Sequence, residues 1–146
     1  AFTVGHPITL ALSVFDKIKV DSGLIEFLIP VTILTTATFN IFNKNFSQKS
    51  ISFNYFMALL FGLIHGMGFS NYLKSLLGTD TSVVQELLAF NLGLEVGQVI
   101  IVAFILLLSF ITVQIINVKR REWNLFLSSA IFGIALIMTI ERISNL

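Results

Sequence analysis

Long apolar stretches with few charges dominate the sequence, and this feature most restricts the folds available to the chain. We place five such stretches at residues 1–15, 22–42, 51–77, 84–117 and 123–143. A helix needs about 20 apolar residues to cross roughly 30 Å of hydrocarbon. Only 12% of the residues are charged, about half the share found in soluble domains. The sequence therefore predicts an all-α protein, a polytopic transmembrane helix bundle of about five spans that forms one domain over residues 1–146.

Two of these stretches depart from the length of a single span. Residues 1–15 are short and open with neither a Met nor a basic segment, so we expect an upstream part of the protein to be missing. Residues 84–117 are too long for one perpendicular helix, so either the helix tilts or its first part, around Gln85 and Glu86, lies at the interface. The basic cluster at residues 119–121 favours the cytoplasm on its own side of the membrane, which places the C-terminus on the other side.

Ionisable residues inside the apolar stretches are the first candidates for a functional site. A charged side chain at the centre of a bilayer costs roughly 2.5 kcal/mol or more, so such residues are rarely incidental. Here they are His6, Glu26, His65 and Glu95, which include both histidines of the chain. Glu26 lies near the start of its stretch, where water can solvate a carboxylate, so we expect it to contribute less than Glu95.

Imidazole, carboxylate and amide groups together suit a borderline divalent cation. The amides of Asn91 and Gln98 share a helical face with Glu95. We therefore predict a metal site formed by His6, His65, Asn91 and Glu95. We assign an entrance or supporting role to Glu26, Gln98, Thr3 and Thr9.

Glycines beside these residues predict close helix packing. Small residues four positions apart let two backbones approach each other in a membrane. The glycines at such positions, or next to them, are Gly62, Gly66, Gly68, Gly93 and Gly97. From them we predict that His65 and Glu95 face each other across the third and fourth stretches.

Several classes of function find no support in the sequence. The chain has no Cys, which excludes disulfides and thiolate metal sites. Its net charge of +1 and scattered basic residues do not indicate nucleic-acid binding. No catalytic motif is visible, so we expect no enzyme activity and no permanently bound cofactor. The expected partners are the lipid bilayer and either further copies of the chain or a larger membrane complex.

Four blocks of sequence resemble the HupE/UreJ family of membrane proteins. They lie at residues 2–10, 24–30, 61–69 and 90–98 and read FTVGHPITL, LIEFLIP, FGLIHGMGF and FNLGLEVGQ. The resemblance implies a multi-pass helical permease of the bacterial inner membrane, associated with nickel or cobalt uptake for hydrogenase or urease. The polar motif residues that it carries over to this chain are His6, Glu26, His65, Asn91, Glu95 and Gln98. Family members have an upstream helix with a His-and-Asp-His pattern, which nothing in this sequence matches.

Three functions remain open at this stage. The first is an inner-membrane permease for nickel or cobalt. The second is a non-transporting structural or accessory subunit of a larger membrane complex, in which a partner or the chain's own side chains would cover the polar face. The third is an intramembrane metal-dependent hydrolase, which needs a metal-bound water and an open coordination position.

Overall fold

The structure is a computed structural model that describes the backbone of residues 1–42, 49–76 and 83–144. Every regular element within these residues is a helix, which confirms the expected all-α class. In chain order, the elements are α1 (Phe2–Val14), α2 (Ser22–Phe42), α3 (Lys49–Leu76), α4 (Val83–Phe110), the π-helical turn η1 (Ile111–Ile115) and α5 (Arg120–Ile143).

Three helices in the described part of the chain are long and apolar enough to span a membrane. They comprise α2, the continuous helix formed by α4 and η1, and α5. The apolar segments Phe2–Val14 of α1 and Tyr55–Ser70 of α3 are shorter. The chain is therefore a membrane protein with three long apolar helices and two shorter ones, and the crossing of the membrane by α1 and α3 stays a prediction.

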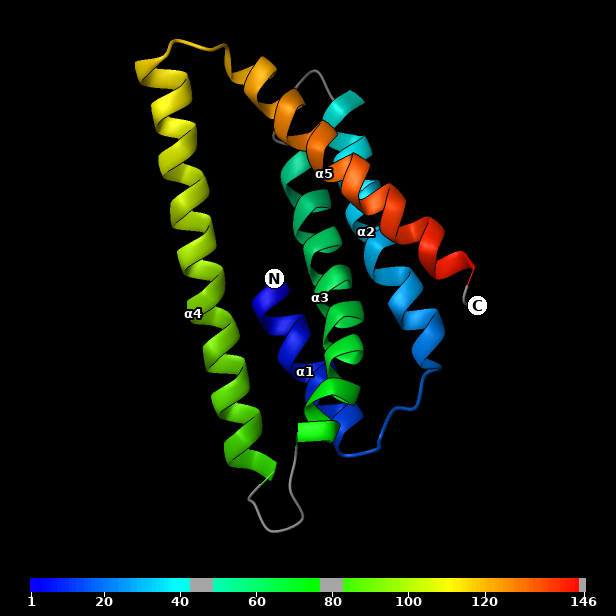
Figure 1. Ribbon diagram of the computed structural model, residues 1–146. Helices are drawn as coiled ribbons and strands as arrows, with labels where there is room; N and C mark the ends of the chain where they lie inside the picture. The colour runs from blue at the N-terminus through cyan, green and yellow to red at the C-terminus, as the bar shows by residue number, and fades with distance from the viewer. Residues whose placement is uncertain (43–48, 77–82, 145–146) are drawn as a thin grey trace.

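The helices pack in two pairs, with α4 set apart (Figure 1). Helix α1 lies against α3, and α2 lies against α5, while a smaller contact between α2 and α3 joins the pairs. Helix α4 touches α1 along a short stretch and connects to α5 through η1. A small apolar core forms where α1, α3 and α4 meet, from Leu10, Val14, Leu73 and Leu87. This core holds the C-terminal part of α1 between the other two helices.

The turn between α1 and α2 fixes where the polar ends of these helices lie. Asp16 adopts a left-handed conformation with φ 54°, and the Lys17 N–H donates to the Leu12 carbonyl at 2.8 Å. These features form the hydrogen-bonded stop that commonly ends an α-helix. The Oδ1 atom of Asp21 then accepts a hydrogen bond from the Leu24 N–H at 2.9 Å and caps the start of α2.

The long fourth stretch forms one continuous helix with a widened last turn. The segment around Gln85 and Glu86 belongs to α4, so the structure has no separate interfacial helix there. The change in helix geometry lies at the other end, where the Ile116 N–H donates to the Ile111 carbonyl five residues back, at 3.0 Å. Asn117, with φ 62°, then reverses the chain toward α5.

Candidate functional site

A small pocket between α1 and α4 gathers most of the polar residues that the sequence identifies. Its lining residues are Phe2, Thr3, His6, Pro7, Asn91, Leu94, Glu95 and Gln98. The cavity measures about 10 Å³, close to the smallest volume that holds one water molecule. Asn91, Glu95 and Gln98 thus share the side of α4 that meets α1, with Asn91 and Gln98 partly buried and Glu95 exposed.

His6 is the most enclosed polar group of this pocket. Its side chain and backbone together are only 5% exposed, and its imidazole forms a hydrogen bond with the Asn91 side chain. The Nδ2 group of Asn91 also donates to the Leu87 carbonyl at 2.9 Å. The Asn91 side chain thus bonds both to its own helix and to the His6 imidazole, and these bonds fix the orientation of the imidazole in the pocket.

His65 lies on α3, outside the set of residues that line this pocket. Its Nδ1 atom is 2.8 Å from the Phe61 carbonyl oxygen. A carbonyl oxygen only accepts, so Nδ1 carries the proton in this contact and Nε2 keeps its lone pair. Such a bond is the usual way a protein orients a ligating histidine.

The ring of Phe2 packs against the imidazoles of both His6 and His65. Its centroid lies 5.7 Å from that of His6, in a stacked arrangement, and 5.5 Å from that of His65, edge-on. Phe2 was not among the predicted site residues, although it opens the first of the four blocks that resemble the family.

The predicted metal ligands are only partly brought together. His6, Asn91 and Glu95 share the pocket. Among the residues that the structure describes, no three His, Cys, Asp or Glu side chains are grouped closely enough to hold a metal ion. The set of four ligands and the facing of His65 toward Glu95 both stay predictions.

The glycines of α3 allow the close approach that positions His6. A Cβ added at Gly62 would lie 2.6 Å from the Phe2 carbonyl oxygen, and one at Gly66 would collide with the His6 carbonyl and the Thr9 hydroxyl. The Thr9 hydroxyl donates to the Leu63 carbonyl at 2.7 Å across the same contact. On α1, Gly5 has the same role, which the sequence analysis missed.

The other predicted packing glycines behave differently from one another. Gly68 faces α2, where an added Cβ would lie 2.5 Å from the Ile29 side chain. At Gly93 and Gly97, an added Cβ would meet nothing within 4 Å in the described part of the chain. Their role in helix packing therefore stays a prediction.

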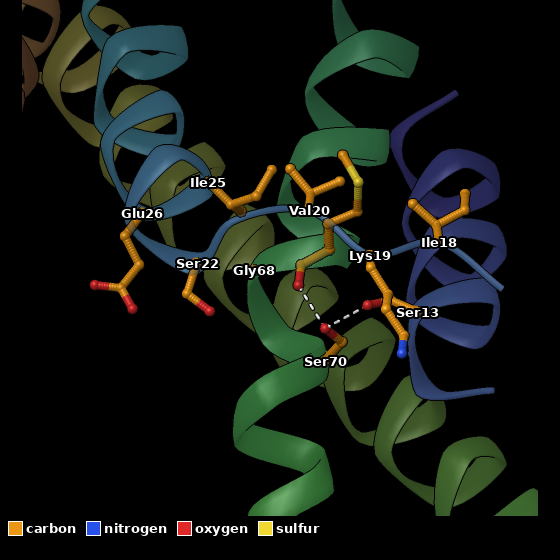
Figure 2. A pocket seen from close by; sticks show the side chains of 10 residues that line it. Ser13, Ile18, Lys19, Val20, Ser22, Ile25, Glu26, Gly68 and Ser70 are labelled. Atoms are coloured by element: carbon orange, nitrogen blue, oxygen red, sulfur yellow. Dashed lines mark hydrogen bonds between the residues drawn. The ribbon is translucent and has the colours of Figure 1, made fainter. Parts of the chain in front are cut away.

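A second, larger pocket lies near the other end of α1 (Figure 2). It measures about 100 Å³, and its polar lining side chains include Ser13, Lys19, Ser22, Glu26 and Ser70. The Ser13 hydroxyl donates to Ser70 Oγ at 2.7 Å. The sequence analysis missed both serines, although Ser13 continues the helical face of His6 and Thr9.

Glu26 forms an ion pair that joins the start of α2 to the end of α5. Its Oε2 atom lies 2.8 Å from the Nη1 atom of Arg142, and both side chains are nearly half exposed. The two helix ends therefore lie on the same side of the protein, as expected for spans of alternating direction.

We expect this ion pair to add little stability. Because both groups are solvated, their coupling energy in a double-mutant cycle of Glu26→Gln and Arg142→Gln should be below about 1 kcal/mol. The measurement is reversible unfolding of the four proteins in mixed detergent micelles. A coupling energy above about 2 kcal/mol would show that the pair is far less solvated than its exposure indicates.

Comparison with known proteins gives one result. A protein-family profile described as HupE / UreJ protein matches residues 1–142 of the chain. No curated protein and no solved structure gives a significant match.

Proposed function

The chain belongs to the HupE/UreJ family, and from this premise we propose that it is a bacterial inner-membrane permease for a divalent transition metal, nickel or cobalt. The family is associated with nickel and cobalt uptake and is transporter-like rather than enzymatic. The only support for the hydrolase hypothesis is therefore the presence of histidine and carboxylate side chains that could bind a metal.

The pocket between α1 and α4 is the observation that carries the proposal. It places an imidazole, a carboxylate and an amide, from His6, Glu95 and Asn91, around one small cavity, where His6 is buried and Glu95 is exposed. Imidazole nitrogen and carboxylate oxygen are ligands that nickel and cobalt accept. In the proposal, His65 completes the ligand set when the metal passes, with its Nε2 lone pair as the donor.

The second pocket supports an entrance on the Glu26 side. Its polar lining suits water, which a permease needs at the mouth of its path. His6, Thr9 and Ser13 follow one another along a single face of α1, and His6 and Ser13 line the two pockets. In this arrangement, Glu26 attracts cations to the second pocket, here called the outer pocket. Glu95 binds them at the pocket between α1 and α4, here called the inner pocket.

The accessory-subunit hypothesis has one observation in its favour. Helix α4 exposes apolar side chains along much of its length, including Leu88, Leu92, Val96 and Val99. Gly93 and Gly97 lie open on the same helix. Lipid covers such a face in a permease, and a neighbouring helix covers it in a subunit of a complex.

The deciding experiment is metal uptake by cells that express the protein, with nickel, cobalt, zinc and copper compared at equal protein level. We expect uptake of nickel or cobalt, reduced at least about tenfold by His6→Gln, because even the loss of a group that only orients a ligand costs 10- to 100-fold in metal affinity or activity. The matched control is Asn40→Ala, which removes an exposed polar side chain on α2 outside both pockets. Normal membrane insertion without uptake of any of the four metals would favour the accessory subunit.

A further inference from the structure

A third cavity lies at the corner where α4, η1 and α5 meet, and it belongs to neither of the pockets described above. It measures about 310 Å³. The apolar part of its lining, here called the apolar wall, includes Leu106 and Phe110 of α4. The polar part, here called the polar wall, includes Gln114 of η1 with Arg120 and Trp123 of α5.

The corner holds its shape through a bond between the two helices. The Trp123 Nε1–H donates to Ser109 Oγ at 2.8 Å, and Ser109 Oγ in turn donates to the Ile105 carbonyl at 2.7 Å. The indole ring also stacks on Phe126, with centroids 5.8 Å apart. Trp123 is therefore held in the lining of the cavity, near the start of α5, and tryptophans concentrate at membrane–water boundaries.

The charge at this corner is positive and largely uncompensated. Lys119 lies 3.9 Å from Glu122 in an exposed pair. Within the described residues, neither Arg120 nor Arg121 has a carboxylate partner. Arg120 lines the cavity, whereas Arg121 does not.

We infer that this cavity binds an anionic phospholipid, with the headgroup phosphate at Arg120 and an acyl chain along Leu106 and Phe110. The apolar wall continues into the exposed apolar surface of α4, so an acyl chain that lies there stays in contact with the bilayer. Basic pockets between membrane helices are established sites for acidic lipid headgroups. A free phosphate would use the polar wall alone and leave the apolar wall empty.

Trp123 is the only tryptophan of the chain, so its fluorescence reports on this cavity alone. The protein is reconstituted in phosphatidylcholine bilayers that contain increasing fractions of phosphatidylglycerol brominated on its acyl chains, which quenches nearby indoles. Brominated phosphatidylcholine in unlabelled phosphatidylcholine serves as the reference. We expect phosphatidylglycerol to bind beside Trp123 about fivefold or more tightly than phosphatidylcholine, as one basic residue near an anionic lipid provides.

Three variants distinguish binding in the cavity from a general attraction of anionic lipid to positive charge. Arg120→Gln should abolish the preference for phosphatidylglycerol, and Arg120→Lys should keep most of it. Arg121→Gln removes the same charge from the neighbouring position and should leave most of the preference in place. Equal quenching by the two lipids in the unmodified protein would overturn the proposal, and so would equal losses in Arg120→Gln and Arg121→Gln.

Inorganic phosphate distinguishes the two sources of the phosphate group. At millimolar concentration it should not relieve the quenching by brominated phosphatidylglycerol, because it gains nothing from the apolar wall. Relief of the quenching by inorganic phosphate at constant ionic strength would reduce the site to an anion site and contradict the lipid assignment.

Discussion

Gly66→Ala is expected to destabilise the protein by about 1–3 kcal/mol, the usual cost of overpacking a close contact. The added methyl group would collide with the His6 carbonyl and the Thr9 hydroxyl. A backbone carbonyl has no alternative rotamer, so α1 must move away from α3 and the Thr9 bond to Leu63 weakens. The measurement is the free energy of unfolding in mixed detergent micelles.

The matched control for this prediction is Gly97→Ala on α4. No described neighbour lies within 4 Å of a Cβ at that position, and alanine is a better helix former than glycine by about 0.5–1 kcal/mol. The two glycine variants should therefore change stability in opposite directions. A destabilisation by Gly97→Ala as large as that by Gly66→Ala would show that α4 has a close partner in the membrane.

Glu95→Gln is expected to lower metal uptake at least about tenfold, since the loss of a group that only orients a metal ligand already costs 10- to 100-fold. Glu95 is the carboxylate of the inner pocket, and glutamine keeps its shape while it removes the negative charge. Protein level and membrane insertion should not change, because the face of α4 remains polar. The measurement is the initial rate of nickel or cobalt uptake at equal protein level.

Glu26→Gln provides the comparison for Glu95→Gln, since it makes the same chemical change at the outer pocket. Both carboxylates are exposed, but Glu26 already pairs with Arg142, so its charge contributes less to holding a metal ion. We expect a smaller loss of uptake in Glu26→Gln. Comparable losses in the two variants would contradict the assignment of Glu95 to the inner site.

The elements of this fold were predictable from sequence because each apolar stretch ends at a local signal. The turn at Asp16 and the basic residues at 119–121 bound helices close to the expected positions. The pairing of the helices was not predictable in the same way. Gly5 brings α1 close to α3, but a glycine in an apolar stretch does not specify which helix it contacts.

The candidate site was predictable in part for a similar reason. The face that joins Asn91 to Glu95 follows from helical spacing alone, and both residues line the pocket. The position of His65 depends on how α3 rotates about its axis. Gly62 and Gly66 face α1, and successive residues point about 100° apart on a helix of 3.6 residues per turn. His65 therefore lies to one side of the contact that Gly66 makes, where Phe2 of α1 packs against its ring, and only the packed helices reveal this contact.

The bond between Thr9 and Leu63 has a consequence for how the protein is made. The two residues are 54 positions apart, and chains grow at about 5–20 residues per second, so α1 waits roughly 3–10 s for α3 to emerge from the ribosome. During that interval, His6 and Thr9 lack the partners on α3 and α4 that cover them in the finished protein. Both side chains are buried in the finished protein, and uncovered polar groups are costly in lipid. We therefore expect α1 to reach its final packing only after α3 has been made.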